Sequence, residues 1–266
     1  MTQTNHTNDS GHFQSHNNTI PTNPYKAPAQ LAVGGYVNCT KSALVVAFDD
    51  VHYSLSTSPF NGGFHHTLAL RNQQLNFFVN TEKELPGGSV AEYLSLEFEQ
   101  EDYPLNFCTG LITSASMEWH AYAAVTSDDI IVEVIATAGY DQTAHRAGDG
   151  FYYKESDGQF REPHTINLLV FTNQALTDGA MTKALITITE AKTIALWENN
   201  ILNQAGTHPA SGTATDGIIF TIDTNGPILT DAGTFSQFGD TLAKTVRLAM
   251  NRALENNRTC KALQEK

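Results

Sequence analysis

Side chains that can carry out acid–base chemistry are concentrated in residues 187–192, which read TITEAK. This stretch holds one carboxylate, Glu190, one ammonium group, Lys192, and the hydroxyls of Thr187 and Thr189. A carboxylate can move a proton, an ammonium group can neutralise developing negative charge, and an activated hydroxyl can attack a carbonyl carbon. The same residues could equally form a solvated helix face on which threonines bond back to the helix carbonyls.

The apolar spacing around this stretch is helical, and helical geometry separates its charged groups. Successive residues turn by about 100° around a helix axis. Glu190 is therefore expected near Lys183 and Thr187, whereas Lys192 is expected near Thr189. Glu190 and Lys192 cannot face one pocket unless the helix ends or kinks between them.

A second candidate is the loop SGTATD at residues 211–216, directly before an apolar strand pattern. Gly212, Thr213 and Thr215 supply hydroxyls and accessible backbone amides, and Asp216 adds a carboxylate. Polar loops next to buried strands are common ligand sites in α/β proteins. The alternative is an ordinary polar turn.

A third candidate is the loop SPFNGGFHH, residues 58–66. The adjacent glycines Gly62 and Gly63, after Asn61, allow a positive φ and a close approach of the backbone to a ligand. A plain tight turn would use the same residues. The histidines that follow, and those elsewhere in the chain, match no metal-site spacing, so no metal is expected.

The elements that must position these groups follow from hydrophobic periodicity. Short apolar runs predict strands, and periodic runs predict helices that begin near Ser89, near Thr177 or Asp178, and near residue 234. The strands are expected at 43–48, 52–58, 75–80, in a hairpin over 119–139, and at 165–171 and 217–223. The expected fold is α/β (mixed α+β), a single layered domain with a mixed sheet flanked by helices. A single sheet and an αββα sandwich both remain open.

Composition limits the classes of partner. A formal charge of −13 without a basic stripe disfavours nucleic acid. Three widely spaced cysteines favour a reducing compartment, and the absence of a signal peptide or membrane span predicts a cytoplasmic protein without a membrane partner. Residues 1–28 are expected to be a disordered polar leader, 29–258 the folded domain, and 259–266 a charged tail. Oligomeric state is open.

The familiar enzyme signatures are missing. The sequence has no GxSxG, HExxH, Walker or GxGxxG motif, which removes the main support for a serine esterase, a zinc protease, a nucleotide triphosphatase or a dinucleotide oxidoreductase.

Seven strings in the chain nevertheless resemble one family in order and approximate spacing. They are LSTSPFNGG, TGLITSAS, ATAG followed by RAGD, TINLLV, LTDGAMTKALITITEAKTIAL, SGTATD and DAGTFSQFGDTLAKTV. This pattern, from about residue 44 to 254, is similar to the adenosylcobinamide amidohydrolases, the CbiZ family. The resemblance implies an enzyme of cobalamin salvage that cleaves the aminopropanol amide of adenosylcobinamide, with the corrinoid as substrate and no separate cofactor.

The resemblance also implies roles for particular residues. Glu190 or Asp216 is expected to act as base, Lys192 to orient or neutralise, and Thr189 or Thr215 to be the nucleophile if the route is covalent. The expected substrate-binding residues are Asn61, Gly62, Gly63, Thr109, Thr137, Asn167, Gly212, Thr213 and Thr215. The Glu190 face, the Asp216 loop and the Asn61 loop are expected to meet in one cavity. Two alternatives remain: a corrinoid-binding protein of the same fold, and an amidohydrolase of another small amide.

Overall fold

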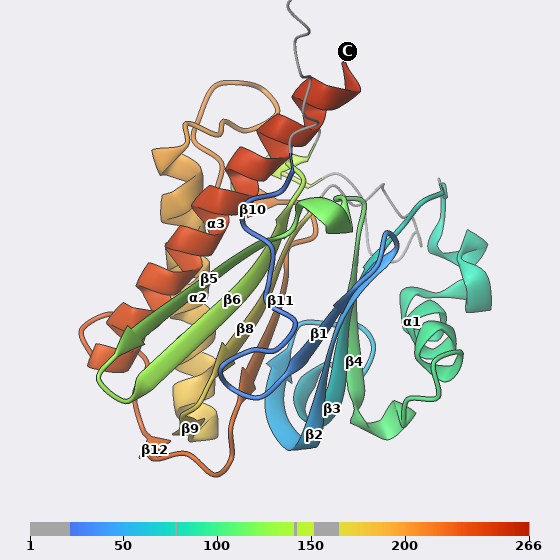
Figure 1. The fold of residues 1–266 in the computed structure, drawn as a ribbon. Coiled ribbons are helices and arrows are strands. Elements are labelled where there is room, and N and C mark those ends of the chain that lie inside the picture. The colour runs from blue at the N-terminus through green and yellow to red at the C-terminus, as the bar shows by residue number, and fades with distance from the viewer. Residues whose placement is uncertain (1–21, 78, 141–142, 152–164, 266) are drawn as a thin grey trace, which may run out of the picture.

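A mixed sheet of eight strands forms the centre of the structure, a computed structural model that describes residues 22–77, 79–140, 143–151 and 165–265 (Figure 1). Its strands are β1 (Tyr36–Cys39), β2 (Ala43–Ser56), β3 (Gly63–Gln74), β4 (Cys108–Thr113), β5 (Ala121–Ser127), β6 (Ile130–Ala138), β8 (Ile166–Thr172) and β11 (Gly217–Ile222). The α-helices are α1 (Val90–Glu99), α2 (Asp178–Glu198) and α3 (Gln237–Gln264). Two short pairs lie outside the sheet: β7 (Ala144–His145) with β10 (Gly212–Thr213), and β9 (Ala175–Leu176) with β12 (Ile228–Leu229).

The strand order is β4-β3-β2-β11-β8-β6-β5, with β1 paired to β2 beside this path. Within this sheet the pairs β3–β4 and β8–β11 are parallel, and the other pairs are antiparallel. The first part of β2 pairs with β1 and its last part, Tyr53–Ser56, pairs with β11. An irregular register between Ala47 and His52 separates the two parts. Because such irregularities bend a strand, β2 can serve both halves of the sheet.

The two halves of the sheet pack against each other, and helices cover the outer faces. In β8, Leu168 and Val170 belong to the core shared with α2 and α3, whereas Leu169 and Phe171 face a core shared with β2 and β3. On the far side, α1 packs over the β3–β4 end (Figure 1). The layers are therefore helix, sheet, sheet and helix. This confirms the mixed α/β fold and selects the αββα arrangement.

The local signals for the helices are confirmed. Ser89 Oγ accepts a hydrogen bond from Glu92 N at 3.1 Å and caps α1, and Thr177 Oγ1 accepts one from Ala180 N at 3.3 Å and caps α2. The apolar residues of α2 that recur at spacings of three and four form a stripe, which is buried in the core apart from a half-buried Leu185. The stripe consists of Met181, Ala184, Leu185, Ile188, Ala191 and Ala195. Burial of this stripe fixes how the helix is rotated, and so fixes where its polar residues point.

Two features of the first half differ from expectation. The strand predicted at 75–80 is wrong: β3 ends at Gln74, and residues 75–77, 79 and 80 are not in a strand. The strand instead begins at Gly63 and includes His65 and His66, which the sequence assigned to a loop. The pairing of the β3 main chain with β2 and β4 stabilises this strand in spite of its polar side chains.

Both ends of the predicted domain also need correction. Residues 1–21 lie outside the described part, but Asn23 Nδ2 donates to the carbonyls of Glu118 and His120 at 2.8 and 2.7 Å. Ala27 N donates to His120 Nε2 at 2.9 Å, so the leader boundary at residue 28 is too late. At the other end α3 continues to Gln264, so most of the predicted tail is helical.

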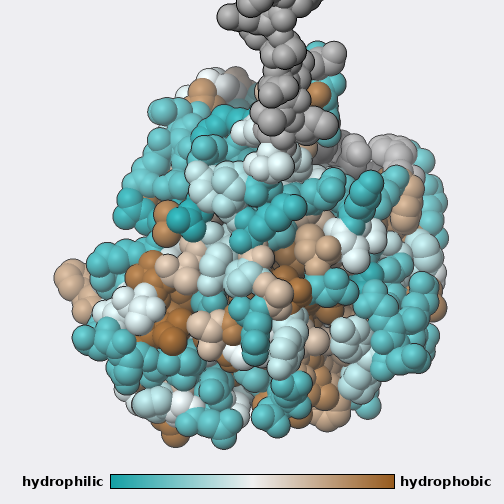
Figure 2. Space-filling view, viewed as in Figure 1, coloured by the Kyte–Doolittle hydropathy of each residue, from teal (hydrophilic) through white to brown (hydrophobic). Residues whose placement is uncertain are grey.

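The visible face of the molecule is mainly hydrophilic, as expected for a chain with a formal net charge of −13 (Figure 2). Figure 2 shows a mainly hydrophilic face with smaller groups of hydrophobic side chains. Among the described residues, none of the helices has the length and apolar character to cross a membrane.

Candidate active site

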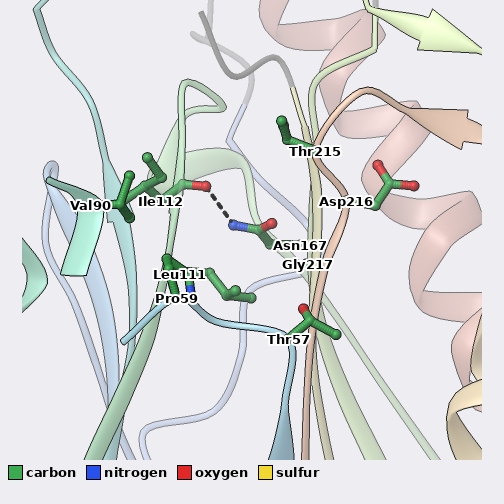
Figure 3. A pocket seen from close by; sticks show the side chains of 9 residues that line it. All are labelled: Thr57, Pro59, Val90, Leu111, Ile112, Asn167, Thr215, Asp216 and Gly217. Atoms are coloured by element: carbon green, nitrogen blue, oxygen red, sulfur yellow. Dashed lines mark hydrogen bonds between the residues drawn. The ribbon is translucent and has the colours of Figure 1, made fainter. Parts of the chain in front are cut away.

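A cavity of about 190 Å³ lies where β2, β4, β8 and β11 come together (Figure 3). It is lined by Thr57, Pro59, Val90, Leu111, Ile112, Asn167, Thr215, Asp216 and Gly217. These residues come from the end of β2, from β4, from the start of α1 and from the starts of β8 and β11. The cavity thus lies at the amino ends of the parallel pair β8–β11, and the polar loop before β11 forms part of its wall.

Asp216 is the one ionisable side chain in this lining. Its Oδ2 accepts a hydrogen bond from Lys192 Nζ on α2. Its Oδ1 accepts from Thr213 N at 3.0 Å, from Thr213 Oγ1, and from Ile166 N at 3.3 Å. The Lys192 and Asp216 side chains are only 8% and 13% exposed, so their attraction is weakly screened. The carboxylate is therefore held in one position, with acceptor capacity left on Oδ2.

Gly212 allows this ion pair to form. A Cβ at Gly212 would lie 2.8 Å from Lys192 Nζ and closer still to Asp216 Oδ2. Glycine is needed at this position because no side chain fits between the backbone and the pair. Lys192, and not Glu190 as expected, is therefore the residue of the TEAK segment that meets the SGTATD loop.

Asn167 lies in the cavity wall beside Gly217. Its Nδ2 donates to the carbonyl of Ile112 at 3.0 Å, drawn as the dashed line in Figure 3, and to Asn72 Oδ1 at 2.7 Å. Asn72 Nδ2 in turn donates to Thr137 Oγ1 at 3.0 Å. Thr137 therefore lies behind Asn167 and does not line the cavity.

The Asn61 loop supports the cavity from outside. Asn61, with a φ of 50°, donates through Nδ2 to the carbonyls of Leu105 and Cys108 at 2.9 and 2.8 Å. Gly62 packs too closely on the Ser58 carbonyl to admit a Cβ, and Gly63 has a φ of 79°. None of the three lines the cavity, so the tight-turn interpretation describes their geometry.

Thr109 has a comparable structural contact. Its Oγ1 donates to the carbonyl of Phe60 at 3.0 Å and lies 2.9 Å from Ser56 Oγ. These bonds hold the segment after β2 against β4 and thereby place Thr57 and Pro59 at the cavity.

Glu190 and Thr189 lie elsewhere. Glu190 is exposed on α2 and lines a different cavity, of about 300 Å³, together with Lys183, Thr187, Asp231 and Thr234. Thr189 is exposed and bonds back to the Leu185 carbonyl at 2.8 Å. The expectation that the Glu190 face, the Asp216 loop and the Asn61 loop meet is therefore wrong. The helix stays regular through residue 192, so Glu190 and Lys192 remain on different faces.

Several lining residues were not singled out from the sequence. Thr57, Pro59, Leu111 and Ile112 belong to the strings LSTSPFNGG and TGLITSAS, which carried the resemblance without marking these positions. Val90 lines the cavity and Asn72 lies behind Asn167. No sequence motif marked either residue for a role in the site, because their placement depends on the packing of α1 and β3 against other elements.

The arrangement offers a carboxylate with a lysine behind it, an amide oxygen and two hydroxyls. The Thr57 hydroxyl is hydrogen-bonded to β11: it accepts from Ile218 N at 2.9 Å and donates to the Ile218 carbonyl at 3.3 Å. The Thr215 hydroxyl has no hydrogen-bond partner among the described residues. Within the same part of the chain, no cluster of three or more His, Cys, Asp or Glu side chains could hold a metal ion.

Comparison with known proteins gives one relative at substantial identity. The uncharacterized protein MJ1613 of Methanocaldococcus jannaschii is 32% identical over 249 residues, which cover 86% of this chain and 92% of the relative.

Two solved structures show a loose similarity. The PH0078 protein of Pyrococcus horikoshii has a TM-score of 0.44 at 12% identity and covers 87% of this chain and 82% of its own. A β-aminopeptidase of Burkholderia sp. has a TM-score of 0.44 at 10% identity and covers 89% of this chain and 88% of its own. Neither similarity bears on the chemistry of the site.

A match to a family model is also found. It spans residues 25–262, which include all of the cavity-lining residues as well as Lys192. The chain therefore belongs to the CbiZ family, the adenosylcobinamide amidohydrolases.

Proposed function

We propose that this protein hydrolyses the aminopropanol amide of adenosylcobinamide and releases adenosylcobyric acid, a reaction of cobalamin salvage in the cytoplasm. The observation that carries the proposal is a convergence of sequence strings. Four of the strings that resemble the family, LSTSPFNGG, TGLITSAS, TINLLV and SGTATD, contribute residues to one cavity. A fifth string, which contains TEAK, contributes Lys192, and this residue donates a hydrogen bond to Asp216.

The size of the cavity supports entry of the amide arm alone. A volume of about 190 Å³ suits a short chain of a few heavy atoms but is too small for a corrin macrocycle. The macrocycle then lies outside the opening, and the scissile bond reaches Asp216. Binding energy from the macrocycle can hold the arm in place, which is how remote contacts assist catalysis.

Asp216 is the proposed base. As water adds to the amide carbon, its proton passes to Asp216 Oδ2; when the C–N bond breaks, this proton moves to the departing nitrogen. The products are a carboxylic acid and the amino alcohol. Lys192 beside the same oxygen stabilises the carboxylate before the first transfer and again after the second. A covalent route would use as nucleophile the hydroxyl of Thr215, for which the described part of the chain provides no hydrogen-bond partner.

Incubation of the purified protein with adenosylcobinamide, followed by chromatography of adenosylcobyric acid, tests the proposal. Product is expected with the wild type and is expected to disappear in Asp216→Asn. Spectral binding without product in the wild type would instead identify a corrinoid-binding protein. If neither binding nor product is observed, the substrate is another small amide.

A second variant distinguishes the two routes. Thr215→Ala is expected to retain turnover if water attacks directly. Loss of turnover in Thr215→Ala, together with an acyl adduct on wild-type Thr215 in mass spectrometry, would establish the covalent route.

A further inference from the structure

A row of three hydrogen-bonded, buried side chains, two amides and one hydroxyl, runs from the cavity wall into the interior. Asn72, Asn167 and Thr137 are 2%, 1% and 1% exposed and come from β3, β8 and β6. They connect the two packed halves of the sheet through Asn167 Nδ2 to Asn72 Oδ1 and Asn72 Nδ2 to Thr137 Oγ1. Buried polar groups without partners are costly, so these bonds hold the side chains in a single arrangement.

The backbone carbonyl of Ile112 fixes the donor and acceptor in each hydrogen bond that links these three side chains. The Ile112 carbonyl can only accept a hydrogen bond, so the atom of Asn167 that faces it must be the amide nitrogen, Nδ2. The same Nδ2 also donates to Asn72, which must therefore present its oxygen to Asn167 and its nitrogen to Thr137. The orientation of the Asn167 amide group is thus fixed by its neighbours.

The consequence is an uncharged acceptor at the cavity wall. Asn167 Oδ1 lies beside Gly217, where an added Cβ would approach it to 2.8 Å, and both residues line the cavity. No donor in the described part of the chain bonds to Oδ1. The polar side-chain atoms there that are both fully buried and without a partner are His65 Nε2 and Asn257 Oδ1, so Asn167 Oδ1 does not belong to that class. An acceptor held this rigidly at a cavity wall is suited to a donor on a ligand.

We propose that Asn167 Oδ1 accepts the N–H of a secondary carboxamide substrate, and that Asn72 and Thr137 are positioning residues that keep this oxygen facing the cavity. This inference rests on the proposed function and names the group that the site recognises. The cavity then distinguishes an amide from the matching ester, because the ester has no N–H.

The chemistry of the acceptor also orients the scissile bond. An amide oxygen repels the substrate carbonyl oxygen, so the carbonyl cannot point at Asn167. In a trans amide the N–H and C=O point in opposite directions. Binding of the N–H by Asn167 therefore directs the carbonyl away from it, and one contact sets the orientation of the bond to be cleaved.

The test compares adenosylcobinamide with its ester analogue, in which oxygen replaces the amide nitrogen. For each compound kcat/KM is measured where turnover occurs, and affinity by spectral titration where it does not. Asn167→Leu is expected to lower the value for the amide by about tenfold to a hundredfold more than the value for the ester, the effect of one buried hydrogen bond.

A matched pair of variants tests the positioning residues. Thr137→Val keeps the shape of the side chain and removes the acceptor for Asn72, so it is expected to lower the amide-to-ester ratio by about threefold to tenfold. Thr137→Ser keeps the hydroxyl and is expected to restore the wild-type ratio. Thermal melting of each variant separates these effects from loss of folding.

The outcomes separate this inference from the proposed function. Wild-type binding of the amide without cleavage, with the ratios as expected, would refute the proposed function and support the recognition of N–H. Equal losses for amide and ester in Asn167→Leu, or no binding of the amide at all, would overturn the inference. So would a Thr137→Ser variant that behaves like Thr137→Val while remaining folded.

Discussion

Lys192 on α2 donates a hydrogen bond to Asp216, the residue directly before β11. This contact joins a helix of the outer layer to the edge of the cavity, and both side chains are largely buried. Because each charge depends on the other for compensation, the loss of either partner would leave an uncompensated buried charge.

Removal of the lysine is expected to destabilise the protein strongly. Lys192→Met leaves the Asp216 carboxylate buried without its partner, at a cost of about 3–5 kcal/mol in the free energy of unfolding. Denaturant unfolding measures this change. The control is Lys244→Met, which breaks the Lys244–Asp240 pair, 62% and 51% exposed, and is expected to cost about 0.5 kcal/mol or less. Equal effects of the two substitutions would contradict the importance of the buried pair.

Gly212 is expected to tolerate no side chain. Gly212→Ala places a methyl group against Lys192 Nζ and Asp216 Oδ2, so the pair must separate or the loop must move. The expected cost is about 1–3 kcal/mol in unfolding free energy, with a loss of at least tenfold in kcat/KM. Gly179→Ala is the control, since no atom lies within 4 Å of the added carbon and alanine favours a helix by up to about 1 kcal/mol. A Gly212→Ala enzyme with wild-type kinetics would disprove the close approach.

Glu190 is expected to be dispensable for turnover. It is exposed and lines a cavity on another face of α2, apart from Asp216. Glu190→Gln should therefore keep kcat/KM for adenosylcobinamide within about twofold, whereas Asp216→Asn should abolish it. Steady-state kinetics of the two variants side by side decide the matter. Loss of turnover in Glu190→Gln with normal turnover in Asp216→Asn would place the active site in the cavity that Glu190 lines.

His120 is expected to make stability depend on pH. Burial lowers its pKa below the usual value of about 6.5, and its Nε2 accepts from Ala27 N while Nδ1 lies 2.7 Å from the Met117 carbonyl. As pH falls below about 6.5 the unfolded chain binds a proton that the folded protein does not, so folding becomes less favourable. The melting temperature should therefore fall between pH 7.5 and pH 5.5.

Variants identify the source of this dependence. Burial also lowers the pKa of His65, so His120→Gln should reduce the pH dependence without removing it. An unchanged slope in His120→Gln would assign the effect to other groups.

The sequence by itself determined the local elements. Apolar runs and periodicity specified β8, β11 and α2, and Ser89 and Thr177 specified two helix starts, because these signals depend on residues a few positions apart. Helical geometry also separated Glu190 from Lys192 before any tertiary contact was known. The prediction that failed locally, a strand at 75–80, concerned an apolar run whose place in the sheet was taken by the more polar residues before it.

Tertiary structure alone decided which of these groups share a site. Asp216 meets Lys192, and Asn167 meets Asn72, because β2 pairs with β11, β8 runs parallel to β11, and the two halves of the sheet pack together. Asn72 and Asn167 are 95 residues apart, and no local pattern encodes such a pairing. Contacts of this kind arise when distant apolar faces are buried together, so the position of each polar side chain is known only once that packing is known.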